Sequence, residues 1–204
     1  MNDPGKPKQA RSIETREKII ETGLKMFGEI GYHATSSKKI AKAAGVATGT
    51  FYNHFKDKKS LLLELHRRHM DETHENLARF FMQTPLWNAE SLDGFTLLRQ
   101  MLDIVYKSHE FAPSLQQEID ALSHTDPDFA ELNRVADAEA SEKLNHILSS
   151  HRDAMRIEDM DAAYFVISHT IQPVIHAMLV SKPPMEKSRI LDALADMFSR
   201  FLFE

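Results

Sequence analysis

Hydrophobic residues recur at helical spacing along most of this chain, and no stretch shows the strict alternation that is typical of a strand. Gly and Pro residues interrupt the pattern at intervals. We therefore predict an all-α fold of about nine helices. The longer ones are expected at 12–28, 58–82, 91–109, 126–151, 159–180 and 185–203. Three shorter ones are expected at 36–45, at 49–54 after an opening Thr48 or Ala47, and after Pro113.

The most informative stretch is 36–58, SSKKIAKAAGVATGTFYNHFKDK. Ser36 suits a helix N-cap, and Ile40, Ala43 and Ala44 would form a small apolar face behind it. Gly45 can end that helix because it tolerates a positive φ. The stretch thus predicts a helix, a short turn and a second, very short helix.

The second short helix has two distinct sides. Phe51 and Phe55 are four residues apart and so share one side, which we expect to be buried. The other faces carry polar or small residues and no acid: Thr48, Gly49, Thr50, Tyr52, Asn53 and His54. A polar helix held from behind by two aromatic rings is typical of the recognition helix of a helix-turn-helix motif.

The rest of the chain supports this motif. We expect a flexible tail over 1–11, in which Lys6, Lys8 and Arg11 either contact DNA or are simply solvated. Residues 12–57 would form a three-helix DNA-binding domain, with Ser12 capping its first helix and Ile13 on its apolar face. Residues 58–204 would form a separate, helical C-terminal domain.

Charge is divided unevenly along the chain. Residues 1–70 contain 14 Lys and Arg against 7 Asp and Glu, whereas residues 71–204 contain 11 against 23. The two parts therefore carry +7 and −12, which together give the formal net charge of −5. A basic first third on an acidic protein suits DNA binding at one end, although chance unevenness would give the same numbers.

Several classes of function are not supported. The chain has no cysteine, hence no disulfide framework, thiolate metal site or cysteine nucleophile. No phosphate-binding glycine loop, nucleophile elbow or HExxH motif is present, so we do not expect an enzyme. His66, His69 and His74 share a predicted helix, but Arg67 and Arg68 would repel a cation, and neither a metal nor another cofactor is expected.

The sequence also bears on location. The N-terminus is polar and does not resemble a signal peptide. The longest apolar candidate, 162–180, is interrupted by Ser, His, Gln and Pro residues, so we expect no membrane span and a cytoplasmic protein.

The pattern IAKAAGV-x-x-GTFY-x-HF-x-x-K-x-x-L resembles the DNA-binding domain of the TetR (tetracycline-repressor-like) family of transcriptional regulators, densely over 16–63. This resemblance and the exposed faces together predict that DNA is contacted by ten residues: Ser36, Ser37, Lys38, Thr48, Gly49, Thr50, Tyr52, Asn53, His54 and Lys58. Thr48, Thr50 and Asn53 suit base edges, and Tyr52 and His54 suit phosphates. Thr48 and Asn53 depart from the residues common in the family, so the operator sequence cannot be inferred.

The resemblance implies a homodimer that reads a palindromic operator. The last two helices are the candidates for the interface because the helix at 159–180 is apolar on more than one side. Its Pro173 is expected to kink it. The alternative is that these helices only complete the core of one chain. The expected interface residues are Phe165, Val166, Val174, Met178, Leu194, Met197, Phe198 and Phe201.

The family also implies a pocket for a small effector in the C-terminal domain. Aromatic, Met and His side chains suit an apolar or amphipathic ligand, although ordinary core packing is the better explanation for each one taken singly. The candidates are Phe80, Phe81, Trp87, Met101, Tyr106, His109, Phe111, Tyr164, His169 and His176.

Together these features predict a ligand-released repressor. The competing hypothesis is a DNA-binding adaptor whose C-terminal domain binds a protein partner instead of a small ligand.

Overall fold

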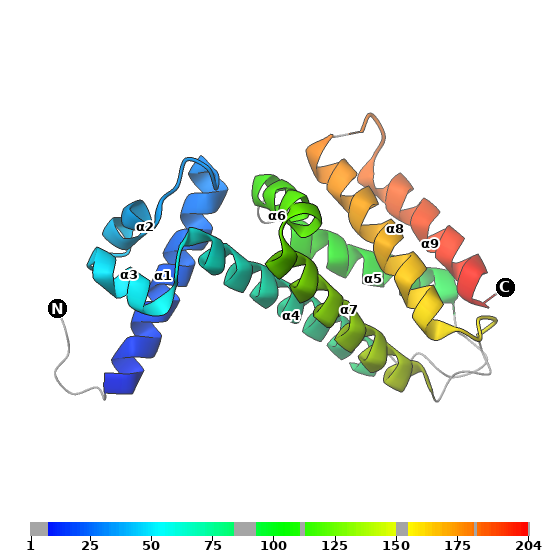
Figure 1. The fold of residues 1–204 in the computed structure, drawn as a ribbon. Helices are drawn as coiled ribbons and strands as arrows, with labels where there is room; N and C mark the ends of the chain where they lie inside the picture. Colours follow the sequence, from blue (N-terminus) through cyan, green and yellow to red (C-terminus); the bar gives the residue numbers. More distant parts are fainter. Residues whose placement is uncertain (1–7, 84–92, 111–112, 150–154, 182, 204) are drawn as a thin grey trace. The chain divides into compact units, whose positions relative to one another are not determined.

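The computed structural model describes residues 8–83, 93–110, 113–149, 155–181 and 183–203, and in these ranges it is all-α, as predicted (Figure 1). The described residues form nine helices and no strand. The helices are α1 (Lys8–Ile30), α2 (Ser37–Ala43), α3 (Thr48–His54), α4 (Lys58–Gln83), α5 (Gly94–His109), α6 (Pro113–Thr125), α7 (Pro127–Leu148), α8 (Met160–Val180) and α9 (Lys187–Phe203).

The chain forms two compact units, Met1–Arg68 and His69–Glu204. Helix α4 belongs to both, because the division falls inside it. The first unit thus extends past Asp57, where the sequence places the domain boundary. The first turns of α4 belong to it because Leu61 and Leu62 are completely buried.

The core of the first unit is made by α1, α2, α3 and the start of α4. Ile19 and Phe27 of α1, Ile40 of α2 and Phe51 of α3 are all fully buried. Gly23 lets α1 and α4 approach closely, since a Cβ there would lie 2.5 Å from a Leu61 methyl carbon. This packing fixes α2 and α3 against a stable support.

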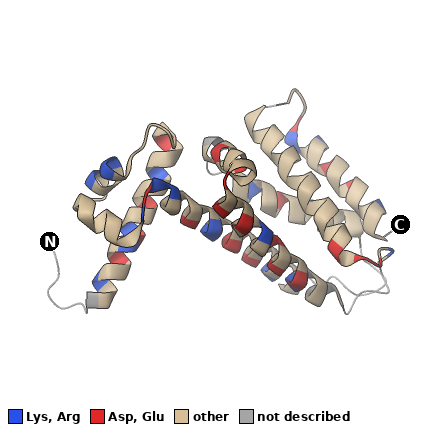
Figure 2. Cartoon of the chain, viewed as in Figure 1, with Lys and Arg blue, Asp and Glu red and all other residues tan. Residues whose placement is uncertain are grey.

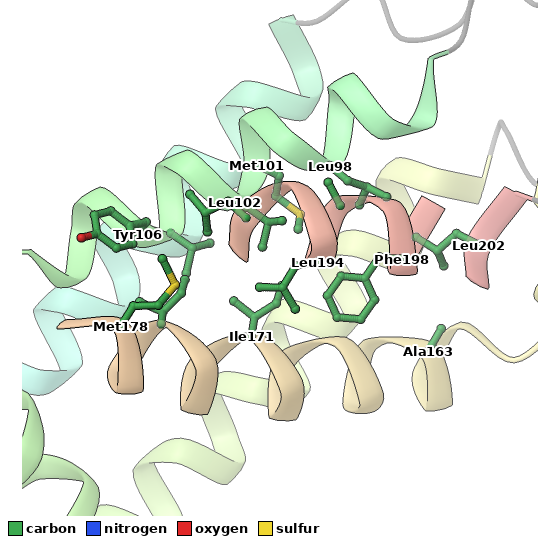
Figure 3. Close-up of a cluster of buried hydrophobic side chains, with 14 residues drawn as sticks. Leu98, Met101, Leu102, Tyr106, Ala163, Ile171, Met178, Leu194, Phe198 and Leu202 are labelled. Carbon is green, nitrogen blue, oxygen red and sulfur yellow. The ribbon is translucent and has the colours of Figure 1, made fainter. Parts of the chain in front are cut away.

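The core of the second unit lies where α5, α8 and α9 face one another, as Figure 3 shows. Leu102 of α5, Ile175 of α8 and Leu191 of α9 are completely buried in it. Helices α6 and α7 pack against each other and against α8. Phe129, at the start of α7, is also fully buried.

Helix α1 differs from the prediction at both ends. It begins at Lys8, so residues 8–11, assigned to the tail, are helical, and Ser12 lies inside the helix and is not its cap. Lys, Gln, Ala and Arg are good helix formers, which explains the earlier start. Gly28 does not end α1, which instead stops before Gly31 with its φ of 84°. Ile13, expected on the apolar face, is 57% exposed.

Helix α8 is the most apolar helix and is mostly uncovered. Its length and composition would allow it to cross a membrane, although the sequence pattern argues against a span. One such helix is weak evidence for a membrane protein, and only 22% of its most apolar window is buried. Pro173 is exposed and the helix continues through it to Val180. The described residues therefore leave an apolar side of α8 exposed, which is a feature of interaction surfaces.

Candidate nucleic-acid interface and effector pocket

The turn between α2 and α3 has fixed geometry. The Ser36 side chain caps α2 by accepting a hydrogen bond from the Lys39 backbone N–H at 3.3 Å, as the sequence predicts. Gly45 has a φ of 65°, a conformation that other residues rarely adopt. Its N–H donates to the Lys42 carbonyl at 3.1 Å, and the Val46 N–H donates to the Ala41 carbonyl at 3.0 Å. These bonds satisfy the last carbonyls of α2 and set the direction of α3.

Two aromatic rings hold α3 in place. Phe51 is completely buried and Phe55 is 5% exposed, with their ring centroids 5.9 Å apart. Ala47 opens the helix without a side-chain cap. A seven-residue helix of this kind would not be stable alone, so its conformation depends on the packing of these two rings.

The structure brings the expected DNA-contacting residues together within the first unit. Tyr52 is 54% exposed, and Thr48, Gly49 and Asn53 are also exposed. Thr50 and His54 are half-buried. At the start of α2, Ser36 and Lys38 are exposed and Ser37 is half-buried. Figure 2 shows Lys and Arg on α2 and no acidic residue on α2 or α3, so the face can approach a polyanion.

Lys58 has a structural role that the sequence does not reveal. Its Nζ donates to the carbonyls of Tyr32 and Thr35 at 2.8 and 3.0 Å and lies 4.0 Å from the centroid of the Tyr32 ring. It therefore ties the start of α4 to the turn between α1 and α2. The predicted phosphate contact has to share an ammonium group that already binds two carbonyls.

The start of α4 is capped by a reciprocal pair. The Ser60 N–H donates to Asp57 Oδ1 at 2.7 Å, and the Asp57 N–H donates to Ser60 Oγ at 3.0 Å. The sequence offers Asp57 or Ser60 as the cap, and the structure uses both.

An ion-pair network joins α4 to α1. Glu64 of α4 lies 3.1 Å from Arg16 of α1, 3.1 Å from Arg67 and 2.8 Å from Arg68. Arg68 also reaches back to Glu17 of α1 with two bonds of 2.6 and 2.7 Å. Burial opposes ionisation of Glu64, but the hydrogen bonds from the three arginines outweigh it and lower its pKa to about 2.

Three of the ten pocket candidates line one small cavity. Phe81, Met101 and Tyr164 meet around a space of about 50 Å³ in the second unit. Phe80 lies beside Phe81, with ring centroids 5.5 Å apart. All lining residues other than Tyr164 are apolar: Phe81, Leu97, Leu98, Met101, Met155, Met160, Ala163, Ile167, Leu202 and Phe203.

The other candidates lie elsewhere, which corrects the prediction of one pocket. His109 is buried, and its burial lowers its pKa, while Nδ1 of His176 lies 2.5 Å from a carboxylate oxygen of Asp120. Tyr106 is buried in the core of Figure 3. His169 is exposed and stacks on Phe165 with centroids 4.0 Å apart. Trp87 and Phe111 lie outside the described residues.

The histidines do not form a metal site in the described part of the chain. No group of three or more His, Asp or Glu side chains there has an arrangement that could hold a metal ion. The ring of His69 meets that of His109 edge-on, with centroids 5.3 Å apart.

The expected dimer residues divide into two groups. Phe165, Val166 and Met197 are 60, 46 and 45% exposed, and Val174 and Phe201 are half-buried, so these five can meet a partner. Met178, Leu194 and Phe198 cannot, because they point into the core of a single chain, as Figure 3 shows. The sequence pattern shows that α8 is apolar on several sides, but not which side faces α5.

Comparison with protein families decides the identity. The model described as "Bacterial regulatory proteins, tetR family" matches residues 19–65, and the model described as "Tetracyclin repressor-like, C-terminal domain" matches residues 96–202. This chain belongs to the TetR family. The members of this family are DNA-binding transcriptional regulators, not enzymes, in agreement with the sequence analysis.

Among curated proteins, the TetR-family chain is 48% identical over 52 residues to the transcriptional regulator AcrR of Shigella flexneri. That match covers 26% of this chain and 24% of AcrR. Matches to the first relatives cover less than half of each relative's length, from 17 to 47%. They support the DNA-binding motif and leave the effector unassigned.

Solved structures confirm the TetR-family fold. A regulator from Saccharomonospora viridis in complex with choline has a TM-score of 0.72 at 19% identity, covering 94% of this chain and 99% of that one. FadR of Thermus thermophilus in complex with lauroyl-CoA has a TM-score of 0.65 at 21% identity, covering 89 and 92%. Those two ligands carry opposite charges, so the shared fold does not set the ligand class.

Proposed function

We propose that this TetR-family regulator is a repressor that binds a palindromic operator as a homodimer and leaves it when a small effector binds. The observation that carries DNA binding is the exposed, acid-free face of α3, which two buried phenylalanines hold from behind. The ten predicted contact residues on α2, α3 and the start of α4 form the proposed interface.

Gly49 adds support for close approach to DNA. A Cβ at this position would meet nothing within 4 Å, so packing inside the protein does not require glycine there. Its φ is not in the left-handed region either, because only Gly31 and Gly45 have positive φ among the described glycines. We infer that the space above Gly49 is needed by the DNA backbone or a base edge.

Substitution of Tyr52 tests the DNA-binding proposal. Tyr52→Ala should weaken operator binding by about 1–3 kcal/mol in a fluorescence anisotropy titration, with an unchanged melting temperature because the ring is exposed. Tyr52→Phe is the matched control that keeps the ring. Unaltered operator affinity in Tyr52→Ala would remove the assignment of α3 as the recognition helix.

Salt dependence gives a second test. Contacts to phosphates release counterions, so raising salt from about 50 to about 200 mM should reduce affinity at least a hundredfold. A flat salt dependence would contradict the phosphate contacts.

The dimer proposal rests on the exposed apolar side of α8 and α9. Phe165→Asp should convert the dimer to a monomer in light scattering, because it places a charge in an apolar contact. Ile13→Asp is the control, since Ile13 is equally exposed on α1. A dimer that persists in Phe165→Asp would refute this interface.

Release would act through α4. This helix carries Phe81, which lines the cavity of the second unit, and Glu64, which belongs to the ion-pair network of the first. To release the operator the effector must favour the released state by several kcal/mol. An effector that binds without changing operator affinity would refute this mechanism. We place its action in the cytoplasm.

The adaptor hypothesis keeps one observation in its favour. The cavity of about 50 Å³ is much smaller than the roughly 300–1,000 Å³ of typical ligand pockets. An adaptor would need no cavity. Operator release by any small molecule that binds the second unit would exclude it.

A further inference from the structure

The residues around the cavity indicate the chemical class of the effector, an inference that rests on the effector role proposed above. The phenol oxygen of Tyr164 lies 3.4 Å from Oδ1 of Asp137 on α7, as its hydrogen-bond donor. Burial, followed by the charge of Asp137, raises the pKa of Tyr164, so the phenol stays neutral. The aromatic wall of the apolar cavity therefore ends at a carboxylate.

A second, open hollow adjoins the cavity at Met160, which lines both. It has a volume of about 540 Å³, and its other lining residues are Asn145, Glu158, Asp159 and Asp161. Asp161 and Tyr164 are three residues apart and so lie on one side of α8. The apolar cavity and the hollow lined by carboxylates thus lie on either side of Met160.

Three aspartates near this hollow, Asp137, Asp159 and Asp161, form no ion pair with a Lys or Arg among the described residues. Asp161 accepts hydrogen bonds from Ser141 and Asn145 at 2.7 and 2.8 Å, and Asp159 caps α8 through the Ala162 N–H at 2.9 Å.

The nearby His74 does not supply the missing charge. Burial lowers its pKa, and the charges around it are Asp137, Asp71 and Glu139 against the single Lys143. Figure 2 shows the same excess of acidic residues along α7. An anion would be repelled here, whereas a cation would gain both the carboxylates and the aromatic faces of Phe81 and Tyr164.

The cavity can enlarge. Met101, Met155 and Met160 form part of its lining, and methionine side chains change conformation readily. About 50 Å³ holds only a short alkyl group, so a longer chain requires these side chains to move.

We propose that the effector is an amphiphilic cation, with its apolar body in the cavity behind Tyr164 and its positive head at the carboxylates of Asp137 and Asp161. Movement of the three methionine side chains would make room for the apolar part of the ligand. The negative charges of Asp137 and Asp161 would favour a positively charged head group.

Three probes of equal chain length test this proposal: decyltrimethylammonium, decanol and decanoate. Calorimetry with the full chain should show that the cation binds at least about tenfold more tightly than the other two, and only the cation should release the operator in an anisotropy assay. Asp137→Asn and Asp161→Asn should each weaken the cation about five- to tenfold and leave decanol unchanged. Asp196→Asn on α9 makes the same change in net charge and is the control.

Ile167→Trp tests the location. Ile167 lines the cavity and is half-buried, so a larger ring there fills the space with little overpacking. It should abolish binding of the cation at an unchanged melting temperature. Binding that persists in a folded Ile167→Trp protein would overturn the site.

The outcomes separate the two proposals. If decanoate or decanol binds best and releases the operator, the cation class is overturned and the effector role stands. If the two Asp→Asn variants bind the cation as the wild type does, the role of these carboxylates is overturned. If none of the three probes binds to protein that still binds the operator, the proposal of a cationic effector is overturned. The proposal of a ligand-released repressor then has no support from this cavity.

Discussion

Glu64 offers the sharpest test of how the DNA-binding unit is held together. Replacing it with Gln keeps the shape of the side chain and removes the charge that three arginines contact. Its pKa falls from 4.5 to about 2, and each pKa unit corresponds to 1.36 kcal/mol, which gives roughly 3 kcal/mol as an upper value. Arg16, Arg67 and Arg68 are 34–46% exposed, so solvent screening reduces the expected loss in Glu64→Gln to about 1–2 kcal/mol.

The direction of the pKa shift determines how the stabilisation by Glu64 changes with pH. The folded pKa of Glu64 is lower than the unfolded one, so its stabilisation is fully present above pH 4.5 and is lost as the pH falls toward 2. The difference in unfolding free energy between wild type and Glu64→Gln should therefore be constant from pH 7 to about 5.5. Below pH 4.5 it should shrink by up to about 1.4 kcal/mol per pH unit.

Urea unfolding followed by circular dichroism at several pH values measures this difference. Glu29→Gln is the control, because Glu29 pairs with Lys25 at 3.9 Å and both side chains are well exposed, so less than about 0.5 kcal/mol is expected. A Glu64→Gln penalty that is absent at pH 7, or that does not change between pH 7 and 3, would refute the assignment of this network as an electrostatic link between α1 and α4.

Four further substitutions probe the first unit. Gly45→Ala should cost about 1–2 kcal/mol of stability because of its φ of 65°, whereas Gly49→Ala should leave stability nearly unchanged and weaken operator binding; thermal melts and anisotropy measure the two effects. Lys58→Met should cost about 2 kcal/mol in urea unfolding, since two carbonyls lose a charged donor, and a loss of DNA affinity alone would contradict this. Asp57→Ala should cost about 1 kcal/mol by removing the cap, and a melting temperature equal to that of wild type would exclude a capping role.

The sequence predicts those parts of the structure that local rules determine. The helix-turn-helix is correct to within two residues because a cap, a glycine with positive φ and two aromatic residues four apart each leave a local signature. The start of α1 was missed because Ser12 looks like a cap, but the residues before it form helix equally well.

Contacts between distant segments could not be predicted in the same way. The pairing of Glu17 with Arg68 spans 51 residues, and nothing local marks it. Nothing local shows, either, which apolar residues of α8 and α9 face the core and which face the surface. For this reason Met178, Leu194 and Phe198 were expected at the dimer interface but are buried in the core of one chain. Of the predicted pocket residues, the three that converge come from three helices, and only tertiary packing decides which side chains share a cavity.

The uncovered side of α8 also has a consequence for newly made chains that have not yet met a partner. If the protein is a dimer as proposed, the exposed Phe165 and Val166 stay in water until a second chain arrives. At a chain concentration of about 1 nM and an association rate of about 10⁶ M⁻¹s⁻¹, that wait is roughly a thousand seconds. During this time the apolar stripe is open to lipid surfaces and to chaperones. Under the proposed assembly, slow synthesis of this regulator therefore yields fewer active dimers than half the number of chains made, and translation of several chains from one message would restore the yield.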